Sequence, residues 1–471
     1  MSHQVIEQLK RGLNLRDLVL LNLVAILGLR HLGTSAKFGT SSLVFWVIAA
    51  IFFFIPQGLA VIELSARYPN EGGIYYWTKK AFGEGHGFLC GWCYWINNVA
   101  YYPTLLISSA VIATYIFGQG ESGLSKQWFY VLPTTLIALW VAVVVNIVGI
   151  GTGKWLQNAG GIGTYIPGVV LILLGLYGVF TLQPAHPMTL QAFKPDFTDL
   201  PALNLLASIA FAFAGLELAS TCGDEVQNPR RNLPMSVYVS APLIALVYIA
   251  GTAAVLWLVG SEQIDVVSAF LQAIANGARH VGASLWWVAP VCAALYTVGN
   301  LGGVGAWLSG PARVAFVIGL DRYFPPSFGR VHPKWRTPYV AILVQAVLAT
   351  LFLLVSLLGQ GTRVETVYLI LLDTQLLVYF IPYIYLFVCF IVLRMRDEPD
   401  PTIVRAPGGV IGVWILGVSG ILITLFAMIV ATIPPPGTDA PMLFRLKVMG
   451  GALGFVGLGG LIYRRAQHRH E

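Results

Sequence analysis

The stretch Gly28-Leu29-Arg30-His31-Leu32-Gly33-Thr34 interrupts an apolar run that is long enough to cross a bilayer. A second stretch, Phe213-Ala214-Gly215-Leu216-Glu217, interrupts another such run at the corresponding point half a chain later. Lipid offers no hydrogen bonds to free backbone groups, so a broken helix at membrane depth persists only where it lines a cavity inside the protein. The two breaks together predict a binding site near the middle of the membrane, as in transporters.

Composition places the chain in a membrane. Of its 471 residues, 57% are hydrophobic and only 10% are charged, whereas a soluble domain carries about 25% charged residues. A spanning helix needs about 20 apolar residues. The sequence predicts twelve such helices, at residues 15–37, 41–66, 86–118, 128–150, 156–180, 201–222, 234–259, 284–307, 338–358, 364–393, 410–432 and 443–463.

The distribution of positive charge predicts the orientation. Most Lys and Arg residues lie at the helix ends that share a side with the two termini, and few lie at the opposite ends. Because cytoplasmic loops carry the excess of Lys and Arg, we expect both termini in the cytoplasm. The net charge of +7 follows from this asymmetry and not from a basic stripe, so no nucleic-acid partner is expected.

The order of the predicted helices indicates two repeats and an addition. Residues 15–180 and 201–393 each contain five predicted helices, and each set begins with a broken one. If the two sets are inverted repeats, the breaks cross near the bilayer midplane. Residues 1–14 then form a cytoplasmic N-terminal segment, residues 410–463 two peripheral helices, and residues 464–471 a short cytoplasmic tail.

Three motifs in the same order resemble amino acid permeases of the amino acid–polyamine–organocation (APC) superfamily. They are residues 63–75 (ELSARYPNEGGIY), residues 213–217 with 224–234 (FAGLE and DEVQNPRRNLP), and residues 309–313 with 321–325 (SGPAR and DRYFP). Within the superfamily, four shorter patches look most like the glutamate:GABA antiporter branch. These patches are residues 42–45, 54–56, 307–311 and 406–409.

The resemblance implies an all-α integral membrane protein with the LeuT-type fold, in which two inverted five-helix repeats with broken helices 1 and 6 are followed by two peripheral helices. It implies a secondary active transporter of amino acids in a prokaryotic plasma (inner) membrane, working as an exchanger or a proton-coupled symporter. A polyamine or cation transporter of the same fold and a non-transporting amino acid sensor are the alternatives. No enzyme motif is present and the eight histidines are scattered, so no enzyme activity, cofactor or metal is expected.

The first break suits a substrate carboxylate. The N-terminus of a half-helix presents free N–H groups and the positive end of a dipole. Gly28 and Gly33 let a ligand approach the backbone closely, and Thr34 follows them in the same break. Relatives typically carry Gly-Ser-Gly here, where this chain has Arg30-His31-Leu32-Gly33-Thr34.

Arg30 and His31 are therefore unusual. A charge at mid-bilayer costs about 3 kcal/mol unless it is paired or hydrated. Arg30 either binds a second substrate carboxylate, pairs with Asp373 or Glu217 to hold the break together, or lies nearer to water. His31 either binds substrate or a coupling proton, or is a core histidine bonded to backbone.

The second break suits a substrate ammonium group, because Ala214, Gly215 and Leu216 offer unwound carbonyls. By the resemblance, Phe211 occupies the place of an aromatic gate over the substrate, with a core aromatic as the alternative. Glu217 matches an acidic residue common in the family, and it either braces the broken helix or titrates during transport.

Three further polar residues complete the candidates. Asp373 is an intramembrane carboxylate that holds a proton, pairs with Arg30 or binds a cationic substrate group. Asn98 faces the cavity or bonds across helices. Thr164 falls at or near the place where many relatives carry a lysine that stands in for sodium, and its hydroxyl suits a sodium ligand. Protons or sodium are thus the expected coupling ions, and His31, Thr164, Glu217 and Asp373 the coupling candidates.

Overall fold

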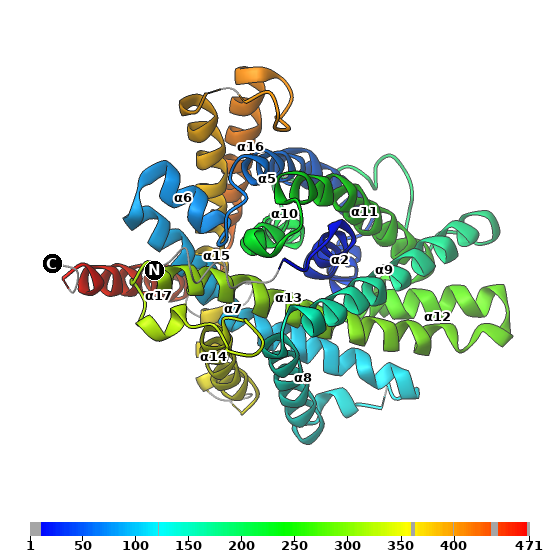
Figure 1. The fold of residues 1–471 in the computed structure, drawn as a ribbon. Coiled ribbons are helices and arrows are strands. Elements are labelled where there is room, and N and C mark those ends of the chain that lie inside the picture. The colour runs from blue at the N-terminus through cyan, green and yellow to red at the C-terminus, as the bar shows by residue number, and fades with distance from the viewer. Residues whose placement is uncertain (1–10, 121, 359–362, 399, 435–440, 469–471) are drawn as a thin grey trace.

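The structure is a computed structural model, and it describes residues 11–120, 122–358, 363–398, 400–434 and 441–468. These residues are almost entirely helical, and the one β pairing among them is an isolated parallel bridge between Leu13 and Val226. In Figure 1 the helices that carry the two breaks, α2 and α10, lie in the middle of the array, with α16 and α17 towards its rim.

The first half of the chain begins with the predicted break. Helix α2 (Leu15–Ile26) starts at Asn14, whose side chain accepts from the Asp17 N–H while the Asp17 carboxylate accepts from the Asn14 N–H, both at 3.1 Å. Helix α3 (Arg30–Ala36) follows at an angle of 42°. The next helices are α4 (Ser42–Ala49), the π-helix η1 (Ala50–Phe54), α5 (Ile55–Arg67), α6 (Ile74–Phe82), α7 (Glu84–Thr114), η2 (Tyr115–Phe117), η3 (Leu124–Lys126), α8 (Trp128–Val148) and α9 (Ile150–Thr181).

The second half begins with the other break. Helix α10 (Leu200–Phe213) ends in an extended segment, and the chain resumes as the 3-10 helix η4 (Leu218–Glu225). The remaining helices are α11 (Pro229–Leu258), η5 (Ser261–Gln263), α12 (Ala269–Val281), η6 (Ala283–Leu285), α13 (Val288–Leu320), η7 (Pro326–Gly329), α14 (Tyr339–Leu358), α15 (Arg363–Arg396), α16 (Gly409–Val430) and α17 (Pro441–Gln467).

Ten helices of the described chain are long and apolar enough to cross a membrane, or eleven if α2 and α3 count as one bent span. The apolar part of α14, residues Tyr339–Val355, is a shorter helix. The all-helical membrane protein is confirmed, whereas the twelve-helix count, the five-plus-five inverted repeat and the domain boundaries stay predictions.

Two elements differ from the expected helix boundaries. The stretch 260–283, for which no helix is predicted, contains α12. This helix is amphipathic and too short to resemble a span, with Phe270 and Ile274 buried and Arg279 and His280 in its last turn. Helix α13 continues thirteen residues beyond the predicted end at 307. The extension contains Arg313, a charge that signals a helix end in sequence but is neutralised by buried carboxylates in the fold.

Glycines bring α9 and α13 close together. A Cβ atom at Gly160 would lie 2.7 Å from the Cα of Gly302, and one at Gly302 would meet the Gly160 Cα at the same distance. No side chain fits between backbones at that spacing, so this contact fixes α9 against α13. It also determines the place of Thr164, one turn along α9 from Gly160.

Candidate functional site

A cavity lies where the two breaks meet. Its walls come from α2, α3, α7, α10, α13 and α15, and are formed by Ala25, Ile26, His31, Asn97, Asn98, Tyr101, Phe211, Ala212, Ala214, Trp307 and Tyr379. Small apolar groups, aromatic rings and a few polar groups thus surround the free ends of two helices, which is the composition of a small-molecule site.

The two breaks touch directly at Gly215. Its φ of +131° is a backbone conformation that favours glycine. A Cβ atom there would lie 2.9 Å from Ile26 Cγ1 and 3.3 Å from Trp307 Cζ2. Gly215 therefore permits both the turn after α10 and the close approach of α2.

The side chain of Tyr248, on α11, contacts backbone groups of both breaks. Its hydroxyl accepts the Gly28 N–H at 3.0 Å and lies 2.5 Å from the Ile26 carbonyl oxygen. The same oxygen is 3.2 Å from the carbonyl oxygen of Ala212. One buried hydroxyl thus satisfies backbone groups on both sides of the first break and touches the last turn of α10.

Trp307 forms the opposite wall and is also held by hydrogen bonds. Its indole N–H donates to the Ala25 carbonyl oxygen at 2.9 Å, at the end of α2. The Tyr102 hydroxyl donates to the Trp307 carbonyl oxygen at 2.7 Å, and the Gln345 amide donates to Tyr102 at 2.7 Å. The ring that faces the cavity is therefore fixed in place by α2, α7 and α14.

Several predicted site residues come together at this cavity. His31, Asn98, Phe211 and Ala214 line it. Asn98 also donates its amide N–H to the Tyr94 carbonyl oxygen within α7, at 2.8 Å. These residues come from α3, α7 and α10 and from the break after α10.

Other predicted residues lie around the cavity without lining it. Leu216 is fully buried behind the second break. Gly33 faces α12, where a Cβ atom would lie 2.9 Å from the Cβ of Ala269. Thr164 packs its hydroxyl against Gly299 of α13 and does not belong to the cavity wall.

Arg30 does not line the cavity and packs against the ring of Tyr101, which does. Its guanidinium carbon is 5.8 Å from the centre of the Tyr101 ring, and one buried guanidinium nitrogen has no hydrogen-bond partner within the described chain. Glu217, one of its two expected partners, bonds elsewhere. The side chain of Asp373, the other, lies outside the described residues, although its backbone belongs to α15.

Glu217 is fully buried at the start of η4 and accepts three hydrogen bonds. The donors are the Gln57 amide at 3.1 Å, the Tyr94 hydroxyl at 3.1 Å and the Tyr383 hydroxyl at 2.9 Å. They belong to α5, α7 and α15, so the carboxylate ties the resumed helix to three neighbours. An acceptor-only group with three donors suits an ionised carboxylate.

A second, larger cavity of about 560 Å³ opens beyond the first break, along α3 and the first turns of α10. Thr34 and Phe38 line it, and His31 and Phe211 line both cavities. The Phe211 ring lies 5.2 Å from the Tyr379 ring, centre to centre. His31 and Phe211 therefore form the boundary between the two spaces.

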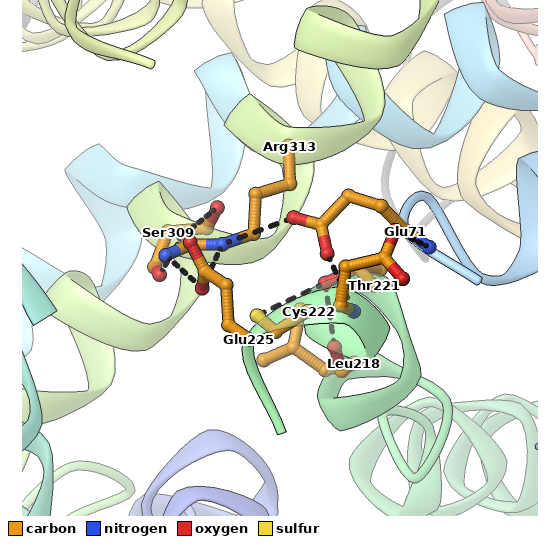
Figure 2. A network of polar contacts seen from close by, with 8 residues as sticks. Glu71, Leu218, Thr221, Cys222, Glu225, Ser309 and Arg313 are labelled. Carbon is orange, nitrogen blue, oxygen red and sulfur yellow. Dashed lines mark hydrogen bonds and ion pairs between the residues drawn. The ribbon is translucent and has the colours of Figure 1, made fainter. Parts of the chain in front are cut away.

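The opposite end of the molecule, which we call the N-terminal face because residues 11–14 lie there, is held by ion pairs. Arg313 pairs with Glu225 at 2.6 Å and with Glu71 at 3.5 Å (Figure 2). Lys154 pairs with Asp17 at 3.3 Å. In addition, the Gly12 N–H donates to the Glu225 carbonyl oxygen at 2.9 Å. These contacts bind the N-terminal segment and η4 to α2, α9 and α13 at this face.

Several residues of the site are not among the predicted ones. Tyr101, Trp307 and Tyr379 line the cavity, and Tyr248 joins the breaks. Tyr101 lies one turn after Asn97 and Asn98, so its position on the same face of α7 was a usable signal. Nothing in the sequence marks Tyr379 or Tyr248, because their roles depend on how α15 and α11 pack.

The site contains no cluster that suits a metal. Over the described ranges, no three His, Cys, Asp or Glu side chains are close enough together to hold a metal ion. The five cysteines are buried and unbonded to one another. The chemistry that the cavity offers is therefore recognition by backbone groups, amides and aromatic rings.

Comparison with known proteins finds permeases, transporters and antiporters. A family model described as amino acid permease matches residues 13–453. The chain is 33% identical to an uncharacterized transporter of Legionella pneumophila, over 95% of each protein. It is 25% identical to a probable agmatine/putrescine antiporter of Lactococcus lactis, over 91% of this chain and 90% of that protein. It is 24% identical to a glutamate/gamma-aminobutyrate antiporter of the same species, over 84% and 80%.

Proposed function

The chain belongs to the amino acid permease family, and on this premise we propose that it exchanges amino acids across a membrane by alternating access around the central cavity. That it is a membrane transporter and not an enzyme follows from the family. The amino acid substrate and the exchange mode are our proposal, which relatives named as antiporters support.

The observation that carries the proposal is the meeting of two helix breaks at one cavity. The start of α3, with the positive end of its dipole, lies at the first break beside His31 of the cavity wall, and we assign the substrate carboxylate to it. The extended backbone at Ala214 offers a carbonyl group beside the cavity, which suits the substrate ammonium. A zwitterionic amino acid has one group of each kind.

The arrangement of the cavities supports an outward-facing state. The large cavity leads to the central one past His31 and Phe211, whereas ion pairs hold the N-terminal face together. We place the N-terminal face in the cytoplasm and the protein in the plasma membrane, as the positive charge in its loops suggests. Opening that face then requires the Arg313 contacts to separate.

Side chains around the cavity are the proposed determinants of selectivity. Phe211 and Asn98 limit its shape and polarity, and Arg30 adds positive charge behind Tyr101. Because a fixed cation repels diamines, amino acids with a second carboxylate are expected to compete better than putrescine or agmatine. His31, Glu217, Thr164 and Asp373 remain the proposed coupling residues.

Counterflow in proteoliposomes tests the proposal. Purified protein is reconstituted, and uptake of radiolabelled acidic, neutral and cationic amino acids, GABA, putrescine and agmatine is measured with unlabelled substrate inside. Uptake that requires internal amino acid would support exchange. Uptake that needs only a proton or sodium gradient would replace exchange by symport, and binding without any flux would identify a sensor.

A further inference from the structure

The ion network at the N-terminal face has more buried carboxylates than cations. Two carboxylates, Glu71 and Glu225, share the single guanidinium of Arg313, and all three side chains are almost completely shielded from solvent (Figure 2). We propose that this cluster is a proton-binding site, in which Glu71 holds the proton while the N-terminal face is closed.

Arg313 lies closer to Glu225 than to Glu71 and donates its carboxylate hydrogen bond to Glu225. Its Nε donates to the Glu225 carboxylate at 2.7 Å and a terminal nitrogen lies 2.6 Å from the same oxygen. The other terminal nitrogen donates to the carbonyl and hydroxyl oxygens of Ser309. The guanidinium is thus fully engaged by α13 and η4, and Glu71 is left at 3.5 Å.

Glu71 has few donors of its own. One carboxylate oxygen accepts the Asp224 N–H at 3.1 Å, and the Asp224 carboxylate in turn accepts the Glu71 N–H at 3.2 Å. The other oxygen, Oε1, is buried without a hydrogen-bond partner in the described structure. A proton on Glu71 removes a buried charge that the surrounding groups do not compensate.

Two further cations described at this face, Lys154 and Arg67, are each paired with a carboxylate of their own. Asp224 brings another carboxylate, and the Cys222 thiol lies between the cluster and Thr221. Lys154, across the adjoining cavity, is bound to Asp17 at 3.3 Å. Arg67, at the end of α5, pairs with Asp397 at 3.6 Å.

Glu71 lies in the loop between α5 and α6, outside the spanning helices. Burial, and after it the negative charge of Glu225, raises its pKa well above the ordinary glutamate value, and the more distant Arg313 offsets this only in part. Charge count and burial therefore favour one proton in the cluster, and the shorter distance from Arg313 to Glu225 assigns that proton to Glu71.

Water has access to this cluster from one side. A small cavity lies against Arg313 and Glu225, and its lining includes the polar residues Lys154, Gln157 and Ser309. It belongs to the N-terminal face and shares no lining residue with the central cavity. We therefore expect the proton to reach the cluster from the N-terminal face, past Glu225 and Arg313.

The site links pH to the closing of that face, a consequence that rests on the proposed function. Arg313 lies on α13, whereas Glu225 and Glu71 lie on η4 and on the loop before α6. Separating them hydrates Glu71 and returns its pKa to the ordinary value, so the proton leaves on opening. Proton binding thus favours the closed face fully below the ordinary pKa, and this effect is lost as pH rises through the raised pKa.

Infrared difference spectroscopy on the purified full chain tests the proton site without any substrate. At pH 5, an exposed glutamate with an ordinary pKa of about 4.3 is mostly ionised. We expect the wild type to show a protonated-carboxyl band that Glu71→Gln lacks. Glu225→Gln should also remove it, because Arg313 then compensates Glu71. The control is Glu63→Gln, since Glu63 has its own cation, Arg394, at 2.5 Å and should leave the band intact.

An identical protonated-carboxyl band in wild type and Glu71→Gln, or a band that persists in Glu225→Gln, would overturn the proposal. A second measurement follows exchange against internal pH. Each unit by which closing raises the Glu71 pKa changes the closed-to-open ratio up to about tenfold. The wild type should therefore slow as internal pH falls, and Glu71→Gln should be slow at every pH. Absence of all exchange would count against the proposed function, while the infrared result would still decide the proton site.

Discussion

The hydroxyl of Tyr248 accepts the backbone N–H of Gly28 at 3.0 Å, at the point where the first broken helix changes direction. The same oxygen contacts the carbonyl oxygens of Ile26 at 2.5 Å and of Ala212 at 3.2 Å. A hydroxyl has one proton to give, so it donates to one carbonyl at a time. The two broken helices are therefore coupled through a single side chain of α11.

Tyr248→Phe removes this hydroxyl and leaves the ring. The Gly28 N–H and one carbonyl then lose their partner while buried, which costs about 1–3 kcal/mol. We expect a lower apparent Tm in detergent and slower counterflow. The matched control is Tyr238→Phe on the same helix, where the side chain is exposed and no loss is expected. Equal Tm and equal counterflow in both variants would show that the Tyr248 hydroxyl does not stabilise the two breaks.

Gly215→Ala places a methyl group where the two breaks touch. The positive φ and the 2.9 Å approach to Ile26 both oppose it, and together they should cost about 2 kcal/mol or more. Gly454→Ala in α17 is the control, because nothing lies within 4 Å of its would-be Cβ. Alanine there should leave the Tm unchanged or raise it. A stable, fully active Gly215→Ala variant would contradict the close crossing of the breaks.

Glu217→Gln keeps the size of the side chain but replaces an oxygen acceptor by an N–H donor. Three donors converge on this carboxylate, so at least one of them meets the new N–H group, at a cost of about 1–3 kcal/mol. A lower Tm together with slower exchange is expected. Glu262→Gln, at an exposed position, serves as the control. Unchanged stability with abolished exchange would favour a titrating role over bracing.

Phe211→Ala removes the ring at the boundary of the two cavities. The central cavity should then open to the larger one, and a bound amino acid should be less enclosed. We expect the half-saturating substrate concentration to rise about tenfold, equivalent to about 1.4 kcal/mol. Phe180→Ala is the control, because that ring is 80% exposed and lies in neither cavity wall. No change in apparent affinity would show that Phe211 is only a packing residue.

Much of the fold follows from local sequence. Long apolar runs specify spanning helices, and Gly28 and Gly215 mark places where those helices stop. Helix ends predicted from sequence are wrong where the local signal is ambiguous. Arg313 resembles a helix end because the carboxylates that neutralise it are 88 and 242 residues away in the chain. Helix α12 was missed because its apolar face is too short for a span.

The candidate site shows the same division. Motifs and breaks predicted His31, Asn98, Phe211 and Ala214 as site residues, and the structure places these four residues around one cavity, while their roles stay predictions. The three hydrogen-bond donors to Glu217 were not predictable from sequence, because Gln57, Tyr94 and Tyr383 belong to three different helices. Whether a buried charge pairs, braces or binds substrate depends on neighbours that only packing supplies.

The sequence by itself determined that this protein spans a membrane, where its helices break and to which family it belongs. These properties depend on hydrophobicity, backbone freedom and motif order, which are read along the chain. Only the tertiary structure decided that Tyr248 joins the two breaks and that Arg313 lies closer to Glu225 than to Glu71. Hydrogen bonds and ion pairs act over about 3 Å in space, and the groups that form them lie hundreds of residues apart.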